Sequence, residues 1–278
     1  MAYRMVYLRI RSGGYNFGWA SDADQAAFKE ESRRLFQELG WTLHAGSNGI
    51  CDTVTKGDQD DCVIVTGDFG GIWSGEQTDG HKLDWLEDKP FTTLFVDGNH
   101  DNFDLLNAYP EHEWHGGRVH QVRPHVLHLM RGQVFDIGGL TFFTMGGAAS
   151  HDIQDGILDP AEPGFERKYW RMRRMGAYFR VLGHSWWPEE MPSEAEYAEA
   201  KANLERAGWH VDYVLTHCAP TSITKALDSC YQPDQLTDFL ESVKGRCQFS
   251  RWFCGHYHVN QVIDERFVVQ WEQMSKIE

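Results

Sequence analysis

Hydrophobic residues from residue 61 onward form short continuous runs, and most of these runs end in glycine or polar residues. Four runs have the length of buried strands: residues 62–66, 92–96, 211–216 and 252–254. Three shorter β-rich runs are separated by turns that contain glycine: residues 126–130, 134–137 and 140–144. Helical patterns cover residues 166–180 and 193–205, the second beginning at a Ser193 cap. Together these patterns predict an α/β domain over residues 61–278.

The first 60 residues have a different pattern. Residues 5–10 alternate as a strand does and end at Gly13-Gly14. Ser21 caps a predicted helix that runs to Leu39, with Gly40 as its stop signal. Residues 44–60 are polar and rich in glycine, so they form a turn-rich segment or a short hairpin. We therefore expect residues 1–60 to be a small, atypical N-terminal α/β module in front of the main domain.

Composition and charge narrow the classes of protein. The chain has 278 residues, 41% of them hydrophobic and only 9 of them proline, which excludes a disordered or low-complexity protein. The net charge of −15 disfavours extended nucleic acid and anionic membrane as partners. No apolar run is long enough to span a membrane, and no secretory signal is visible. We expect a cytoplasmic protein whose six scattered cysteines are reduced thiols.

Polar side chains with metal-binding chemistry follow directly after the predicted strands. They are Asp68, then Asn99, His100 and Asp101, then His217, and finally His256 and His258. Any one of them could be an ordinary turn or buried residue. Open α/β sheets carry their active sites beyond the carboxyl ends of the strands, which is where all of these residues stand. Imidazole, carboxylate and amide groups together are the ligands of a first-row transition metal.

The motifs also resemble a known family. Gly67-Asp68, Gly98-Asn99-His100-Asp101, His217 and Gly255-His256-Tyr257-His258 stand in the order typical of calcineurin-like metallophosphoesterases, and the resemblance covers residues 61–278. Segment 67–73 and Ser150-His151-Asp152 are similar to a bacterial and phage branch of that family. The resemblance implies a two-sheet β-sandwich flanked by helices, in the four-layer arrangement of the family, with a two-metal centre at the strand ends.

The same resemblance implies a function and a role for each site residue. The reaction would be hydrolysis of a phosphomonoester or phosphodiester, in a small phosphorylated substrate or nucleotide, by metal-activated water. Asp68 would bridge two metals, Asn99, His217 and His256 would complete one site, and His258 would serve the other. His100 would protonate the leaving oxygen or neutralise the phosphate, Asp101 would orient its ring, and Asn99 and His100 would contact substrate. Mn²⁺ is the first choice of metal, with Fe²⁺ or Zn²⁺ as alternatives.

One motif of the family is missing. An Asp-x-His motif should follow the first strand, but Arg11-Ser12-Gly13-Gly14 occupies that position and offers no ligand. Three readings stay open. Substitute ligands could come from the N-terminal module, with His44, Asp52, Asp58 and Asp60 as candidates. The protein could bind one metal tightly and a second weakly or not at all. Alternatively, a catalytically impaired member could bind a nucleotide or a protein partner.

Three further segments carry weaker signals. Five histidines at irregular spacing suggest polar surface and partly buried imidazoles rather than a metal tract: His112, His115, His120, His125 and His128. Trp186-Trp187 either packs an insertion on the core or lines a substrate cleft. We expect the acidic helix 193–205 to present a solvent-exposed face. The sequence leaves the natural substrate and the oligomeric state open.

Overall fold

A computed structural model describes Arg34, residues 41–42, 53–54, 61–271 and 275–277. The expected strand 5–10, the substitute ligands His44, Asp52, Asp58 and Asp60, and most of the expected N-terminal helix lie outside these residues, although Arg34 is helical. β1 (Trp41–Thr42) pairs antiparallel with β2 (Thr53–Val54); β2 lies inside the segment 44–60 and β1 lies just before it. The boundary at residue 60 stays a prediction.

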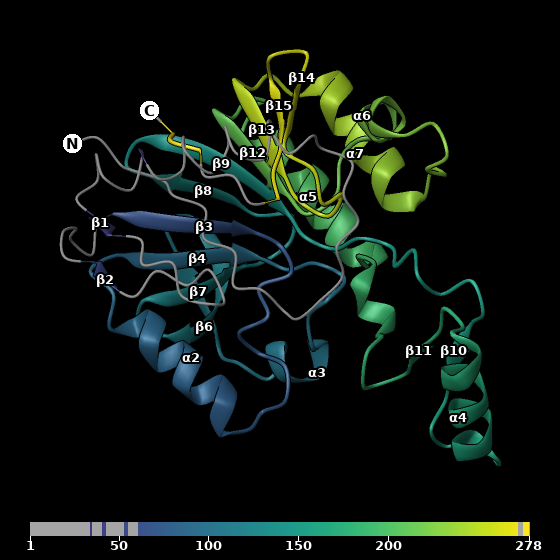
Figure 1. The fold of residues 1–278 in the computed structure, drawn as a ribbon. Coiled ribbons are helices and arrows are strands. Elements are labelled where there is room, and N and C mark those ends of the chain that lie inside the picture. Colours follow the sequence, from purple (N-terminus) through teal and green to yellow (C-terminus); the bar gives the residue numbers. More distant parts are fainter. Residues whose placement is uncertain (1–33, 35–40, 43–52, 55–60, 272–274, 278) are drawn as a thin grey trace.

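A five-stranded sheet contains the first two long apolar runs. Its order is β3-β4-β7-β6-β5, with β3, β4 and β7 parallel and the rest antiparallel (Figure 1). The strands are β3 (Cys62–Thr66), β4 (Thr92–Val96), β5 (Glu111–Trp114), β6 (Gly117–Arg123) and β7 (Val126–Leu129). β3 and β4 have the predicted bounds, and both are buried along their whole length.

A six-stranded sheet has the order β14-β15-β13-β12-β9-β8. It is made of β8 (Val134–Ile137), β9 (Leu140–Met145), β12 (Tyr213–Thr216), β13 (Arg251–Cys254), β14 (Gln261–Ile263) and β15 (Phe267–Val269). The strands β9, β12, β13 and β15 are mutually parallel, and the outer two run antiparallel to them.

The two sheets pack face to face through a shared core. Side chains alternate along each strand, so Ile64 and Leu94 of the first sheet meet Leu215 and Phe253 of the second. The opposite faces are covered by helices. On the five-stranded sheet Val65 packs with α2 (Gln77–Glu87) and α3 (Phe103–Leu106). The protein is therefore a mixed α/β protein, as the strand and helix patterns predicted, and its two large mixed sheets are compatible with the two-sheet sandwich that the resemblance implies.

Three helices cover the outer face of the six-stranded sheet. They are α5 (Glu194–Arg206), α6 (Thr221–Leu227) and α7 (Gln235–Arg246). Ser193 and Glu196 form a capping box at the start of α5, which confirms the predicted cap. The helix is not a wholly solvated face, because Tyr197 and Leu204 are buried in the core beneath it.

A small lobe follows β9 and stands away from the two sheets in Figure 1. It consists of the parallel pair β10 (Ile157–Leu158) and β11 (Arg180–Val181) with α4 (Phe165–Met175) between them. The helix predicted over residues 166–180 was wrong at its end, because Gly176 adopts a left-handed φ of 65° and stops α4 there. The 3-10 turn Pro188–Glu190 then leads the chain to α5.

The topology brings strand ends from both sheets together. β3 and β4 of one sheet and β9, β12 and β13 of the other each lead into a loop that carries polar side chains. None of the helices in the described part of the chain combines the length and apolar character needed to cross a membrane. The described cysteines are all free thiols, and Cys51 lies outside the described residues.

Candidate functional site

Two glycine loops place Asp68 at the centre of the strand ends. Asp68 follows β3 with a left-handed φ of 52°, which is strained for a residue that has a side chain. A Cβ on Gly67 would lie 1.9 Å from Nδ1 of His217, and one on Gly98 would lie 2.3 Å from Oδ1 of Asp68. Only glycine permits this close approach of the two loops to the His217 ring.

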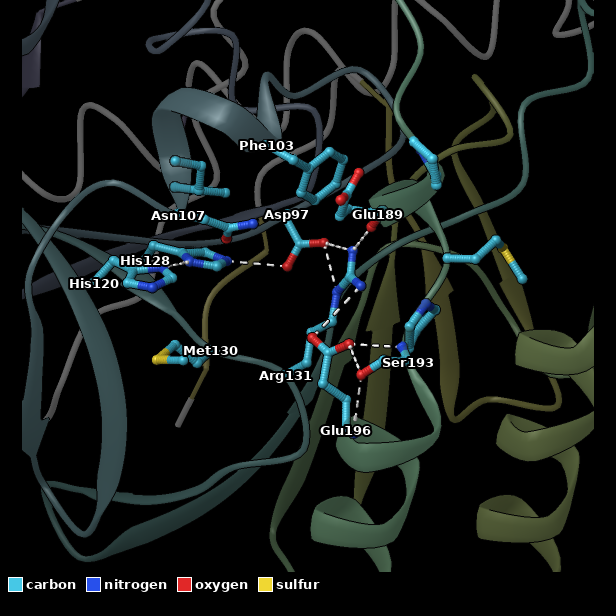
Figure 2. Close-up of a pocket in the computed structure, with 14 residues that line it drawn as sticks. Asp97, Phe103, Asn107, His120, His128, Met130, Arg131, Glu189, Ser193 and Glu196 are labelled. Carbon is cyan, nitrogen blue, oxygen red and sulfur yellow. Dashed lines mark hydrogen bonds and ion pairs between the residues drawn. The ribbon is translucent and has the colours of Figure 1, made fainter. Parts of the chain in front are cut away.

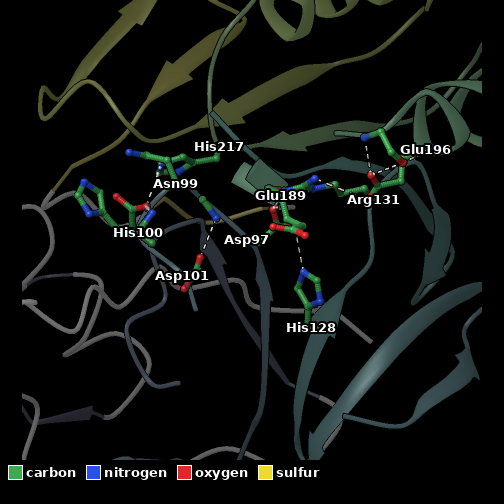
Figure 3. Close-up of polar contacts among 12 residues, drawn as sticks. Asp97, Asn99, His100, Asp101, His128, Arg131, Glu189, Glu196 and His217 are labelled. Carbon is green, nitrogen blue, oxygen red and sulfur yellow. Dashed lines mark hydrogen bonds and ion pairs between the residues drawn. The ribbon is translucent and has the colours of Figure 1, made fainter. Parts of the chain in front are cut away.

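The amide oxygen of Asn99 is the point where the site side chains meet. Nε2 of His217 lies 3.3 Å and Nδ1 of His256 lies 3.1 Å from Oδ1 of Asn99. Nε2 of His217 is also 3.2 Å from Oδ1 of Asp68. Figure 3 shows Asn99 and His217 next to each other, with His100 nearby. Thus Asp68, Asn99, His217 and His256, which the resemblance groups in one metal site, come together from four different loops.

The donor atoms fit a metal ion only if Asn99 is included. In the described part of the chain, no three His, Cys, Asp or Glu side chains by themselves form a group that could hold an ion. With metal–ligand bonds of about 2.1 Å, ligands at right angles or at tetrahedral angles lie about 3.0 to 3.4 Å apart. The separations of 3.1 to 3.3 Å among these side chains match that range. The residues present therefore fit one divalent ion.

Hydrogen bonding fixes how His217 presents its ring. Nδ1 of His217 donates to the carbonyl oxygen of Thr66 at 2.8 Å, so Nε2 faces Asp68 and Asn99. Burial would raise the pKa of Asp68, but the neighbouring His217, together with His100 and His256, holds this pKa well below the usual value. Burial and the nearby His217 lower the pKa of His256. Burial would lower the pKa of His217, but the Asp68 carboxylate outweighs it and raises this pKa. The shifts at Asp68 and His256 favour the anionic carboxylate and the neutral imidazole, the forms that bind metals, whereas the shift at His217 favours its pairing with Asp68.

A buried chain of hydrogen bonds orients Asn99. Its Nδ2 donates to Oγ of Ser150 at 3.1 Å, which turns Oδ1 toward the two histidines. Ser150 Oγ in turn donates to Glu190 at 2.6 Å, and the Ser150 amide donates to the same carboxylate at 2.9 Å. Glu190 is only 3% exposed, so this support comes from the interior of the protein.

His100 stands at the edge of the site beside a positive charge. Its backbone amide donates to Oδ1 of Asp68 at 3.0 Å, and its Nε2 lies 3.3 Å from a guanidinium nitrogen of Arg180. Arg180 is held by Asp152, to which Nε donates at 2.9 Å. The lobe therefore contributes a guanidinium next to the residue predicted to act on the leaving group.

Asp101 is bound to the loop that carries Asn99 and His100, and its implied role in orienting the His100 ring stays a prediction. Its carboxylate accepts the Gly98 amide at 2.7 Å and makes no hydrogen bond to His100 in the structure. Burial and the nearby Asp68 carboxylate raise the pKa of Asp101 to about 7. Asp101 therefore braces the loop that carries Asn99 and His100, and the side chain beside the His100 ring is Arg180.

The two C-terminal histidines have different surroundings. The His256 ring lies 5.1 Å from the His217 ring and 4.9 Å from the His151 ring, measured between centroids. The His258 ring stacks on Trp271 at 5.9 Å. Both residues have left-handed φ angles, 68° and 52°, so the loop after β13 is strained at both positions. His256 therefore belongs to the group formed with Asp68, Asn99 and His217, which we call the Asn99 cluster. His258 instead lies against an aromatic ring.

A buried charge network lies behind the Asn99 loop. Asp97, the residue after β4, binds Arg131 at 2.5 Å and His128 at 3.0 Å. These residues line a pocket of about 470 Å³, with Arg131 reaching across it toward Glu196 (Figure 2). Asp97 and Arg131 are 1% and 6% exposed. The start of the site loop is therefore fixed by a desolvated ion pair.

His120 and His128 extend this network. The Asp97 carboxylate can only accept, so Nε2 of His128 donates to it, and Nδ1 of His128 shares a hydrogen bond with Nδ1 of His120 at 3.0 Å. Of the five irregularly spaced histidines these two are buried, while His112 and His115 are exposed and His125 is partly buried. The structure thus confirms the expected mixture of surface and buried imidazoles.

We expect the free energy of unfolding to fall as the pH drops from about 6.5 to about 4. Burial and the neighbouring His128 lower the pKa of His120 to about 4, below its unfolded value of about 6.5. Stability is fully present above pH 6.5 and is lost toward pH 4, by on the order of 3 kcal/mol. The free energy of unfolding should be measured with denaturant at several pH values. For His120→Asn it should change less steeply with pH over this interval than for the unmodified protein. The exposed control His112→Asn should keep the slope; equal slopes for all three proteins would refute the assignment.

Sequence reasoning missed several residues that the structure places at the site. Glu190 and Arg180 were not identified at all. Ser150, His151 and Asp152 were identified, but not as residues that support the site. The last three were noted only as a family-like segment, but they follow the end of β9 through the Gly146-Gly147 turn, so strand-end position was an available signal. Glu190 and Arg180 carry no such signal, because tertiary packing alone brings them near Ser150 and His100.

Comparison of the chain with protein-family models and with the sequences of curated proteins finds no match.

Proposed function

We propose that the protein hydrolyses a phosphomonoester or phosphodiester with the help of a divalent metal ion. The observation that supports this most is the convergence of Asp68, Asn99, His217 and His256 within 3.1 to 3.3 Å contacts at the strand ends. The two-sheet fold and the order of the motifs are those expected of a calcineurin-like metallophosphoesterase.

The side chains of Asp68, Asn99, His217 and His256 would hold the first ion. Mn²⁺ is our first choice, and Fe²⁺ or Zn²⁺ would suit the same nitrogen and oxygen donors. When bound, such an ion supplies Lewis-acid charge to a phosphate and lowers the pKa of water toward neutrality. The hydrogen bonds from Asn99 to Ser150 and from His217 to Thr66 would keep both donor atoms aimed at the ion.

His100 and Arg180 would handle the phosphate group itself. The guanidinium and the imidazole lie 3.3 Å apart at the edge of the metal-ligand cluster, so together they offer donors to phosphate oxygens. His100 would give its proton to the leaving oxygen, and Asn99 would contact the substrate beside it. Asp152 would hold Arg180 in place through its ion pair.

Mn²⁺-dependent hydrolysis of p-nitrophenyl phosphate and bis-(p-nitrophenyl) phosphate tests this function. We expect nitrophenol release that requires the metal and stops with a chelator. Comparison of the two esters separates a phosphatase from a phosphodiesterase. Absence of turnover with Mn²⁺, Fe²⁺ and Zn²⁺ would refute the proposal.

For His100→Ala we expect turnover to fall by about 10² to 10⁴-fold while metal binding is kept. The reason is that the His100 side chain faces Arg180, whereas only its backbone amide contacts Asp68. Calorimetric Mn²⁺ titration together with steady-state kinetics would separate the two effects. Loss of the metal from this variant would show that His100 is a ligand instead.

We also expect two unequal metal affinities. The second site has Asp68 and His258 as its proposed ligands, and the His258 ring stacks on Trp271. Two protein donors hold a divalent ion weakly, so Mn²⁺ titration into metal-free protein should show one tight and one weak or absent event. Activity should rise with added metal and with pH. Two equally tight sites that survive His258→Ala would contradict this assignment.

A catalytically impaired binding protein is the second candidate function. It is favoured by the missing Asp-x-His motif and by the lack of three clustered His, Cys, Asp or Glu ligands in the described part of the chain. Such a protein would bind a nucleotide or a protein partner at the same loops. A nucleotide titration that shows binding by a protein inactive with every metal would favour this reading.

A further inference from the structure

Helix α4 carries positive charge on a protein that is otherwise strongly acidic. Its eleven residues contain five basic side chains and one acidic side chain, while the whole chain has a net charge of −15. The five are all exposed, and none forms an ion pair within the described part of the chain: Arg167, Lys168, Arg171, Arg173 and Arg174. Repulsion between neighbouring guanidinium groups is therefore uncompensated in the free protein.

An exposed tryptophan stands in the middle of this charge. Trp170 is 58% exposed, one of the few large hydrophobic side chains on the described surface to be so. Residues three and four positions apart share a helix face, so Arg167 and Arg174 flank Trp170, and Arg171 adjoins them. We call Arg167, Trp170, Arg171 and Arg174 the basic face of α4. Just beyond the helix, Tyr178 is 57% exposed.

The basic face is not needed to fold the lobe. Phe165, Tyr169 and Met172 on the opposite side of α4 pack against Leu158 and Val181 of the strand pair. An amphipathic helix that binds a membrane must present its apolar side to the lipid, and in α4 that side is already occupied. What remains outside is mostly charge around the Trp170 ring, with Met175 exposed at the last position of the helix.

We propose that the basic face of α4 binds single-stranded nucleic acid. Guanidinium groups pair with backbone phosphates, and an aromatic ring stacks on any nucleobase, so the two groups together recognise a flexible single strand. The net charge of the chain disfavours extended nucleic acid, but the positive charge here is concentrated on one projecting helix. Binding at this face does not depend on hydrolysis.

The same lobe also reaches the candidate site. β11 follows α4 after a short turn, and its first residue, Arg180, lies 3.3 Å from His100 and is paired with Asp152. A nucleic-acid strand bound to α4 would therefore lie on the same lobe that supplies the Arg180 guanidinium to the proposed phosphoester site. The lobe thus carries both the proposed nucleic-acid-binding face and the Arg180 side chain at the site where a phosphate would be cleaved.

Fluorescence anisotropy with a labelled single-stranded DNA 12-mer, in chelator and about 50 mM salt, tests the proposal without any hydrolysis. We expect binding that weakens about 5- to 150-fold in Trp170→Ala, the loss of one stacked base. The variant R167E/R171E/R174E should abolish most binding and reduce the dependence of log K on log salt by about 2. Circular dichroism would confirm that each variant is folded.

Charge reversals elsewhere provide the matched control. Lys225→Glu and Arg251→Glu change exposed basic residues outside the lobe and should leave oligonucleotide binding within about twofold. The proposal is overturned if the 12-mer does not bind, or if binding is unchanged in the α4 variants. It is also overturned if vesicles of phosphatidylserine and phosphatidylcholine bind through this face while the 12-mer does not. Nitrophenyl ester hydrolysis, measured separately, shows whether the phosphoesterase proposal fails independently.

Discussion

Asp68→Ala will lower kcat/KM for nitrophenyl phosphate esters by more than about 10⁴-fold. Asp68 is the only anionic side chain among the proposed ligands, and in that proposal it alone would be shared between two metal sites. Its Oδ1 contacts both His217 and the His100 amide, so its loss also leaves His217 without its charge partner. A metal ion lowers the pKa of water from 15.7 to about 7, and that advantage disappears when the ion is lost.

Kinetics and metal content should be measured on the same preparation. The control is Asp84→Ala, because this carboxylate is 66% exposed in a surface pair with Arg123 and should leave both values unchanged. His256→Ala should behave like Asp68→Ala, since both remove a group in contact with the Asn99 cluster. Full activity of Asp68→Ala would disprove the assigned centre, whatever the activity of the other variant.

The buried strands could be predicted because their environment is uniform. β3 and β4 are covered on one side by the second sheet and on the other by helices, so every residue is apolar or small. The hairpin β5 and β6 was missed for the opposite reason. The four residues of β5 are exposed or partly buried, and its polar sequence resembles a turn. Pairing with neighbouring strands, which the local sequence does not show, makes it a strand.

The candidate ligands could also be predicted from position alone. Asp68, Asn99, His217 and His256 each follow a parallel strand, and parallel strands end at one edge. The supporting residues could not be found in this way. Glu190 lies on a 3-10 turn that reaches Ser150 across 40 residues of chain, and Arg180 reaches His100 across 80. These two contacts depend on how the lobe and the turn after it pack against the site, and hydrophobic periodicity in the sequence does not predict that packing.

Arg131→Met should destabilise the folded protein by about 3 to 5 kcal/mol. The guanidinium donates to Oδ2 of Asp97 through two nitrogens, at 2.9 and 2.5 Å, and to the Glu189 carbonyl at 2.8 Å. Both side chains are almost fully buried, so methionine would leave the Asp97 carboxylate desolvated with only His128 as a polar partner. Denaturant unfolding measures the change directly.

A double variant separates the ion pair from simple packing. Replacing both partners, in Asp97→Leu/Arg131→Met, removes the isolated buried charge, so we expect it to be about 2 kcal/mol more stable than Arg131→Met alone. Some loss should persist, because His128 then has no carboxylate to receive its Nε2 proton. Arg118→Met is the surface control: its side chain is 39% exposed in pairs with Glu111 and Glu199, and it should change stability by less than about 1 kcal/mol. If the double variant is as unstable as the sum of its single variants, side-chain volume rather than charge governs this position.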